Sequence, residues 1–329
     1  MLLQASPHPV AIDWQHRASK NGGGGRTHNL HRDAASVLMK AMDSTGLSGK
    51  VVELYAFLGD NLSAISTKLK YSAIGSSNSC TNGNWATSDI IAFGGLKDSA
   101  NTTKILQTNL SLSTALAGQE SNTGAHWYTR DTASGAASQI AIGSSSVTVG
   151  NAILGGWVSL GTKDSGLIAG VSNYAVATNA SRIGLHSTLN LNNRTSQYFT
   201  NGVALGAVST VSSGTWLTGN NLTLTSNGSA SFWKRDLLYA DVTVGVTTSD
   251  EINFNLVIRQ FQQFLNRAQA PVINLAGTVA SSSRIQGALT IERRLSGTIA
   301  SSSRIQGSLS GMGVLDFSNA GNSQYVTVI

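Results

Sequence analysis

Apolar and polar residues alternate with a period of two over much of this chain, in short runs separated by glycine-containing pairs. The clearest runs are RIGLH (182–186), QYFTNG (197–202), NLTLT (221–225) and SFWKRDLLYADVTVG (231–245). Such alternation predicts half-buried antiparallel strands joined by tight turns. Asn201-Gly202 and Asn227-Gly228 are two-residue hairpin signals, because both residue types tolerate the positive φ that a twist-matched turn requires.

After Thr248 the apolar spacing changes to that of a helix. A helix is expected over 249–268, with Thr248 and Glu251 as its capping box. Gln262 is expected on the face turned away from the sheets, and four apolar residues on the face toward them: Val257, Phe261, Phe264 and Leu265. A second helix is expected over 30–45, with Gly46 as its stop.

About a dozen short strands are expected between these two helices, at nearly regular spacing. The first is expected at 51–57, and later ones include 89–93, 138–142, 146–149 and 230–239. This pattern predicts an all-β fold, a two-sheet antiparallel sandwich or jelly roll with two peripheral helices. The expected organisation is an irregular N-terminal arm at 1–28, the sandwich at 29–269 and a small β module at 270–329.

The C-terminal module contains an internal repeat. LAGTVASSSRIQGAL (275–289) returns as LSGTIASSSRIQGSL (295–309), a period of 20 residues. A solenoid needs about three repeats, so two copies predict a duplicated pair of hairpins or strands. So small a piece buries little apolar surface and has unpaired strand edges. We therefore expect it to dock on a neighbouring subunit or on another protein through the apolar residues Leu275, Ile285, Leu295 and Ile305.

Composition limits the classes of partner. Charged residues make up 12% of the chain, about half the usual share, so the surface should be rich in hydroxyls and amides. The net charge of +6 is scattered, without a basic run interleaved with aromatics, so no nucleic acid is expected. No apolar run is long enough for a membrane span, and no signal peptide is expected at the N-terminus. Cys80 is the single cysteine, which excludes an intrachain disulfide.

Residues for catalysis or metal binding are sparse. The acidic residues are mostly isolated. Asp236 and Asp241 flank a strand end and are expected at turns or near Lys234 and Arg235. Glycoside hydrolysis needs two carboxylates that face each other across a sugar, so no enzymatic activity is expected. The six histidines lack the spacing of a metal site, and the Asn-rich segment 189–195 lacks the aspartates of a calcium loop. No metal and no cofactor are expected.

Sugar binding is the one ligand class for which residue types are present. Sugars pack on aromatic faces and hydrogen-bond to amides and hydroxyls, and the candidate contacts are Trp85, Trp127, Trp216, Asn220 and Asn221. The competing interpretation is that these tryptophans pack in the core of the sandwich, as tryptophans in β-sandwiches usually do. The sequence leaves both interpretations open.

The order of the segments resembles a known family. Four consecutive features resemble the close of concanavalin-A-like (laminin-G-like) sandwich domains, which are common in bacteriophage structural proteins. They are a strand with an Asn-Gly turn, a strand ending in Phe-Trp, one more strand and a short amphipathic helix. The N-terminal third resembles the start of phage virion proteins of this kind in four segments: AIDWQHRASKNGG (11–23), HRDAASVLMKAM (31–42), VVELYAFLGDNLSAISTKL (51–69) and GGLKDSANTTKILQTNLS (94–111). The resemblance covers residues 10–268.

The resemblance implies a non-catalytic structural component exposed on a phage particle, as a decoration, fibre or tail-associated protein. Such a protein would fold in the bacterial host cytoplasm, form a homo-oligomer and contact other virion proteins. The alternative is a carbohydrate-binding adhesion module that recognises a host surface glycan. One fold can serve both functions, so the resemblance does not choose between them.

Overall fold

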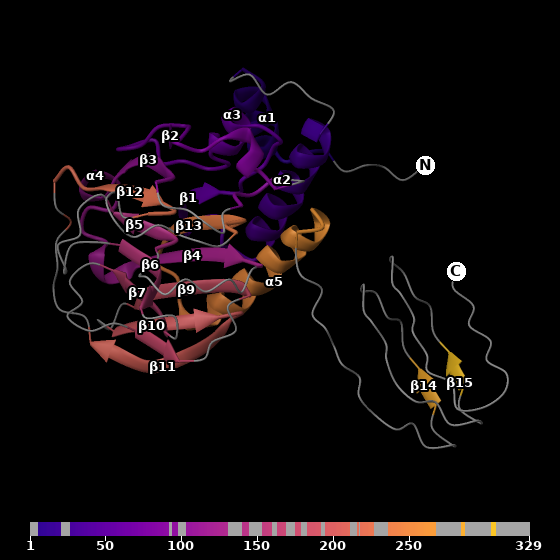
Figure 1. Ribbon diagram of the computed structural model, residues 1–329. Coiled ribbons are helices and arrows are strands. Elements are labelled where there is room, and N and C mark those ends of the chain that lie inside the picture. The colour runs from indigo at the N-terminus through magenta and orange to yellow at the C-terminus, as the bar shows by residue number, and fades with distance from the viewer. Residues whose placement is uncertain are drawn as a thin grey trace. The chain divides into compact units, whose positions relative to one another are not determined.

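The computed structural model divides the chain into two units, Met1–Ala268 and Gln269–Ile329 (Figure 1). It describes residues 6–20, 27–91, 94–97, 103–130, 140–144, 153–159, 163–168, 175–178, 183–191, 195–210, 216, 218–226, 236–267, 284–286 and 304–306. The strands predicted at 146–149 and the turn at Asn227-Gly228 lie outside these residues.

The first unit contains two antiparallel sheets. The six-stranded sheet has the order β1 (Val51–Tyr55), β13 (Tyr239–Val244), β4 (Thr123–Thr129), β9 (Gly184–Leu191), β10 (Thr195–Thr200), β11 (Val203–Thr210). The seven-stranded sheet has the order β2 (Thr81–Gly83), β3 (Ile105–Ser111), β12 (Asn221–Leu224), β5 (Ile142–Ser144), β6 (Ile153–Ser159), β7 (Lys163–Ile168), β8 (Ala175–Thr178). The predicted all-β architecture of two antiparallel sheets is confirmed.

Local turn chemistry determines one of the hairpins as predicted. Asn201 and Gly202 have φ of 53° and 77° and connect β10 to β11. Other predicted strands differ from the structure. In the segment predicted as a strand at 89–93, Asp89 is the last residue of the 3-10 helix Thr87–Asp89. Of the strand predicted at 230–239, the structure describes 236–239, and the named strand β13 begins at Tyr239.

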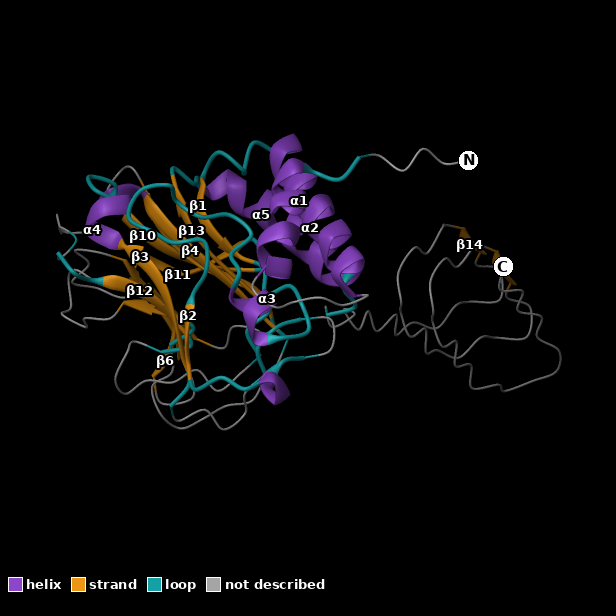
Figure 2. Cartoon of the chain, turned by 90° about the horizontal axis from the view of Figure 1, so that it is seen from above, coloured by secondary structure: helices purple, strands orange, loops and turns teal. Residues whose placement is uncertain are grey.

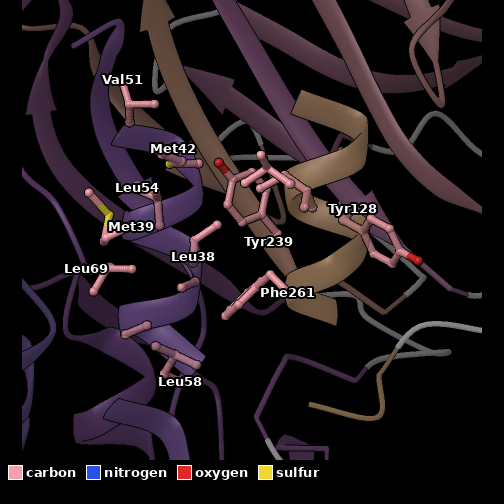
Figure 3. Close-up of a cluster of buried hydrophobic side chains, with 14 of the residues drawn as sticks. Leu38, Met39, Met42, Val51, Leu54, Leu58, Leu69, Tyr128, Tyr239 and Phe261 are labelled. Atoms are coloured by element: carbon pink, nitrogen blue, oxygen red, sulfur yellow. The ribbon is translucent and has the colours of Figure 1, made fainter. Parts of the chain in front are cut away.

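Helices form a third layer on the outer face of the six-stranded sheet (Figure 2). These are α1 (Pro9–Lys20), α2 (Thr27–Ser44) and α5 (Thr248–Phe264). One core cluster lies between the helices and this sheet, and it includes Leu38, Met42, Tyr128, Tyr239 and Phe261 (Figure 3). A second cluster, which includes Trp127, Val242, Leu106 and Leu224, lies between the two sheets. The six-stranded sheet is therefore covered on both faces, and all seven residues of β4 are buried.

The prediction of an irregular arm over 1–28 is wrong, because α1 occupies Pro9–Lys20. Ala11, Trp14 and Ala18 follow helical spacing and are completely buried, and Trp14 Nε1 donates a hydrogen bond of 3.2 Å to the Thr67 carbonyl. Pro9 suits the first turn of a helix, where its missing N–H is not needed. The structure also contains two short helices that were not predicted, α3 (Leu62–Ser66) and α4 (Leu112–Ala115).

Helix α5 is present where expected, with two corrections. Its N-cap is Thr247 with Asp250 as the capping-box partner, one residue earlier than predicted, and Glu251 points into the protein instead. Val257, Phe261 and Leu265 are buried as predicted, but Phe264 is 44% exposed and Gln262 is completely buried. Because α5 packs against α2 as well as the sheet, its buried stripe is displaced toward Gln262, whose side chain donates to the Leu238 carbonyl.

The second unit contains two short strands among its described residues. β14 (Arg284–Gln286) and β15 (Arg304–Gln306) pair in parallel, so that Ile285 lies opposite Ile305. Each of these residues thus pairs with its own copy in the 20-residue repeat. Leu275 and Leu295 lie outside the described residues. None of the helices in the described ranges combines the length and hydropathy that a bilayer span requires.

Candidate functional site

A cluster of buried ionisable groups joins α5 to the six-stranded sheet. It consists of His126, Ser187, Tyr239, Asp241 and Glu251, and we call it the His126 cluster. His126 Nδ1 lies 2.6 Å from Asp241 Oδ1, and His126 Nε2 lies 2.8 Å from Glu251 Oε1. Ser187 Oγ donates to Glu251 Oε2 at 2.6 Å, and the Tyr239 hydroxyl donates to Asp241 Oδ2. Every residue of the cluster is at most 1% exposed.

Strand register brings these residues together. Asp241 on β13 and Ser187 on β9 both lie directly opposite His126 on β4, so the three form one row across adjacent strands. Alternation along β4 turns Trp127 toward the other sheet and His126 toward the helices. Glu251 reaches the row from the first turn of α5, and Phe254 stacks on the His126 ring at a centroid distance of 4.2 Å.

The electrostatics of the His126 cluster favour a charged imidazole. Burial disfavours the imidazolium, but the carboxylates of Asp241 and then Glu251 outweigh it and raise the pKa of His126 to about 10. At neutral pH both ring nitrogens therefore donate to carboxylates. Burial, together with the negative charge of Asp241, raises the pKa of the Tyr239 phenol, which stays protonated and donates.

The His126 cluster contains the residue types of a hydrolase triad but not its geometry. A nucleophilic serine needs a base that accepts its proton. Here Ser187 donates to Glu251, while both nitrogens of His126 are occupied by carboxylates. The groups have no surface that a substrate could reach. The cluster instead holds α5 on the sheet through buried hydrogen bonds and ion pairs.

Two other buried cationic side chains, those of Lys68 and Arg267, also bind partners within the protein. Lys68 Nζ lies 3.0 Å from Glu53 Oε1, with both side chains inaccessible to solvent. Arg267 donates to the carbonyls of Ala56 and Phe57, and burial lowers its pKa to about 9. In the part of the chain that the structure describes, no group of three His, Cys, Asp or Glu residues could hold a metal ion.

The three candidate sugar-binding tryptophans are buried. Trp85, Trp127 and Trp216 are 4%, 1% and 6% exposed, and all belong to the core cluster between the sheets. Trp127 packs parallel to His186, and Trp216 Nε1 donates to the Leu116 carbonyl at 2.8 Å. None of the three rings offers an open face to a sugar, so the structure agrees with the interpretation that they pack in the core.

The other residues singled out from the sequence, two asparagines and two aspartates, differ in burial and in hydrogen-bond partners. Asn220 is buried and its carbonyl accepts from the Leu112 amide, whereas Asn221 is exposed at the start of β12. Asp241 was expected at a turn or near Lys234 and Arg235, but it lies within β13 and is completely buried. Asp236 pairs with Arg130 Nε at 2.8 Å. The sequence therefore did not reveal the His126 cluster, whose members are up to 125 positions apart.

A surface hollow of about 310 Å³ lies between α3 and the start of β2. It is lined by Leu62, Ser63, Ser66, Ser79, Cys80 and Asn82. The backbone brings the two segments together through a bridge between Thr67 and Ser79 and a hydrogen bond of 2.8 Å from the Cys80 amide to the Ser66 carbonyl. No feature of the sequence marked these residues as a site.

Comparisons with known proteins gave matches in structure and none in sequence. No family model matches it, and no curated protein matches it. Trypanosoma rangeli sialidase in complex with sialic acid has a TM-score of 0.44 at 10% identity, over 72% of this chain and 40% of that one. Domain 4 of AbnA, a GH43 extracellular arabinanase from Geobacillus stearothermophilus, in complex with arabinotriose, has a TM-score of 0.37 at 11% identity, over 63% of this chain and 98% of that one. The chain thus spans about two fifths of the sialidase, and scores this low carry no argument about function.

Proposed function

We propose that this protein is a non-catalytic structural component of a bacteriophage particle that assembles through its C-terminal unit. In this proposal the first unit is a concanavalin-A-like (laminin-G-like) jelly roll exposed on the particle surface. The order of its sequence segments supports the assignment. So does the use of the buried ionisable groups, since His126, Lys68 and Arg267 all bind partners within the fold.

One observation carries the assembly role, the parallel in-register pairing of Arg284–Gln286 with Arg304–Gln306. In such a parallel pair, each strand also has an outer edge with backbone N–H and C=O groups that the pair does not use. Because the two sequences are identical, these outer edges carry the same pattern of groups as the edges that pair with each other. A further copy from another chain can continue the ladder in the same register, as in stacked parallel strands. The segment thereby favours partners that carry the same sequence, which is the requirement of a homo-oligomer.

The test compares the full chain with a variant that ends at Gln269, by size-exclusion chromatography with light scattering. We expect the full chain to form an oligomer and the shortened chain to run as a folded monomer. Within the full chain, Ile285→Pro with Ile305→Pro should have the same effect, because proline cannot donate to a strand ladder. Ile285→Val with Ile305→Val is the matched control and should assemble normally. Normal assembly of the shortened chain would refute the proposal.

The alternative is a carbohydrate-binding adhesion module, and of its five predicted contacts the three tryptophans and Asn220 are buried, whereas Asn221 is exposed. A glycan would have to bind elsewhere on the molecule. Contact with other virion proteins and a place on the particle surface belong to the proposal, and electron microscopy of labelled particles would test them.

A further inference from the structure

The hollow between α3 and β2 has the features of a small binding site, independently of the proposed assembly role. We call it the Ser66 hollow. Its floor includes Ser66, the last residue of α3, which is only 7% exposed. Its rim includes Ser63 and Asn82, which are exposed, and its volume of about 310 Å³ lies at the lower end of the range for small-molecule sites.

The hydroxyl of Ser66 has no hydrogen-bond partner among the described residues, although the residue as a whole is only 7% exposed. It also differs from the enclosed unpaired atoms of the core, because its oxygen is open to the hollow. A hydroxyl that opens onto a hollow without a protein partner is available to a ligand, which can exchange contact with water for a direct hydrogen bond. The floor of the hollow is therefore prepared for a polar ligand atom.

Other lining groups extend the same chemistry. The hydroxyls of Ser63 and Ser79 likewise have no partner among the residues that the structure describes. The Asn82 amide is held in place by two hydrogen bonds with the Trp85 backbone, of 3.0 Å from its nitrogen and 3.1 Å to its oxygen. An amide group offers two donors and two lone pairs, so Asn82 keeps one of each for a ligand. Leu62 supplies an apolar wall.

The hollow is electrically neutral. None of its six lining residues carries a charge at neutral pH, since burial raises the pKa of the Cys80 thiol to about 12. The nearby Lys68 is inaccessible and bound to Glu53. A charged ligand would lose hydration here without gaining a counter-charge, which disfavours its binding. Hydroxyls that both donate and accept match a ligand that does the same.

We propose that the Ser66 hollow binds a neutral polyhydroxylated ligand of the size of one monosaccharide. Its hydroxyls would bond to Ser66, Ser79 and Asn82, and the apolar face of its ring would contact Leu62. This site shares no residue with the buried tryptophans, so it does not depend on an aromatic platform.

The test is a nuclear magnetic resonance titration of the full chain with D-glucose, D-galactose and D-mannose, and with their charged analogues glucuronic acid and glucosamine. We expect the amide signals of Ser66, Ser79 and Cys80 to shift with at least one neutral sugar and not with the charged ones.

Matched variants separate binding from folding. Ser66→Ala and Ser79→Ala should each weaken binding about tenfold, the effect of one lost hydrogen bond of about 1.4 kcal/mol. Ser88→Ala, an exposed serine outside the hollow, should bind like the unmodified protein. Ser79→Ala decides the matter if Ser66→Ala fails to fold. The proposal is overturned by shifts located elsewhere, by equal binding of charged sugars, by unchanged affinity in both variants, or by no shift at tens of millimolar sugar.

Discussion

Two phenylalanines three positions apart on α5 provide a direct test of how this helix docks. Phe261 is completely buried in the cluster between the helices and the six-stranded sheet, and Phe264 is 44% exposed. Figure 3 shows Phe261 directed toward the space between α2 and the sheet, near Leu38 and Tyr239. The guanidinium of Arg267 lies over the Phe261 ring at 5.2 Å. The same substitution at both positions therefore compares burial within one helix.

The expected magnitudes follow from these contacts. Truncation of a fully buried phenylalanine to alanine costs about 3–5 kcal/mol, through lost burial and the cavity that remains. Loss of the cation–π contact adds about 0.5–2 kcal/mol. We therefore expect Phe261→Ala to lower the free energy of unfolding by about 4–6 kcal/mol, a large share of the 5–15 kcal/mol typical of a domain. Phe264→Ala should cost less than about 1 kcal/mol, because half-exposed side chains lose little on truncation.

Urea unfolding followed by tryptophan fluorescence measures both variants. All six tryptophans lie before residue 269, so the signal reports the first unit alone. Phe261→Ala should shift the midpoint strongly to lower urea without a change of slope, whereas Phe264→Ala should overlay the unmodified protein. Equal midpoints for the two variants, or a larger loss for Phe264→Ala, would refute the docking of α5 described above.

Two further predictions concern the His126 cluster and a tight backbone contact. Because its pKa is raised from 6.5 to about 10, the stability that His126 contributes is complete below pH 6.5 and is lost as the pH rises through 10. The urea midpoint should therefore fall between pH 6.5 and 10 more steeply in the unmodified protein than in His126→Gln. At neutral pH, His126→Gln should lower the free energy of unfolding by about 3–5 kcal/mol. Parallel pH profiles of the two proteins would contradict the ion pairing. Gly94 has φ of +87° and an added Cβ would lie 2.3 Å from the Phe57 carbonyl oxygen, whereas Gly118 has φ of +72° and open space around it. Gly118→Ala should cost only the about 1–2 kcal/mol of a left-handed residue, and Gly94→Ala at least twice as much in the same assay.

Features that depend on local periodicity could be predicted from the order of the residues. Alternation with a period of two predicted the antiparallel strands, and the Asn201-Gly202 pair predicted a turn that the structure contains. The helical spacing of Val257, Phe261 and Leu265 predicted the buried stripe of α5. These features are readable because the geometry of a strand, a turn or a helix repeats within a few neighbouring residues.

Helix α1 shows where local patterns are insufficient. Only Ala11, Trp14 and Ala18 are buried among its 12 residues, and two of these are small. An apolar stripe this thin gives a weak periodic signal. The helix is stabilised by its packing against α2 and by the bond from Trp14 to the Thr67 carbonyl, both made with distant segments.

Whether the polar residues of the six-stranded sheet are buried or exposed depends on the tertiary structure. The strands of the six-stranded sheet alternate apolar and polar residues, and this pattern predicts that one face of the sheet is exposed to solvent. A helical layer covers that face, so His126, Ser187 and Asp241 are buried where alternation suggests exposure. Their partner Glu251 comes from a helix 125 positions beyond His126, and only strand register and helix docking bring the four together. The Ser66 hollow arises in the same way, because Ser66 and Ser79 meet through backbone pairing that no local pattern specifies.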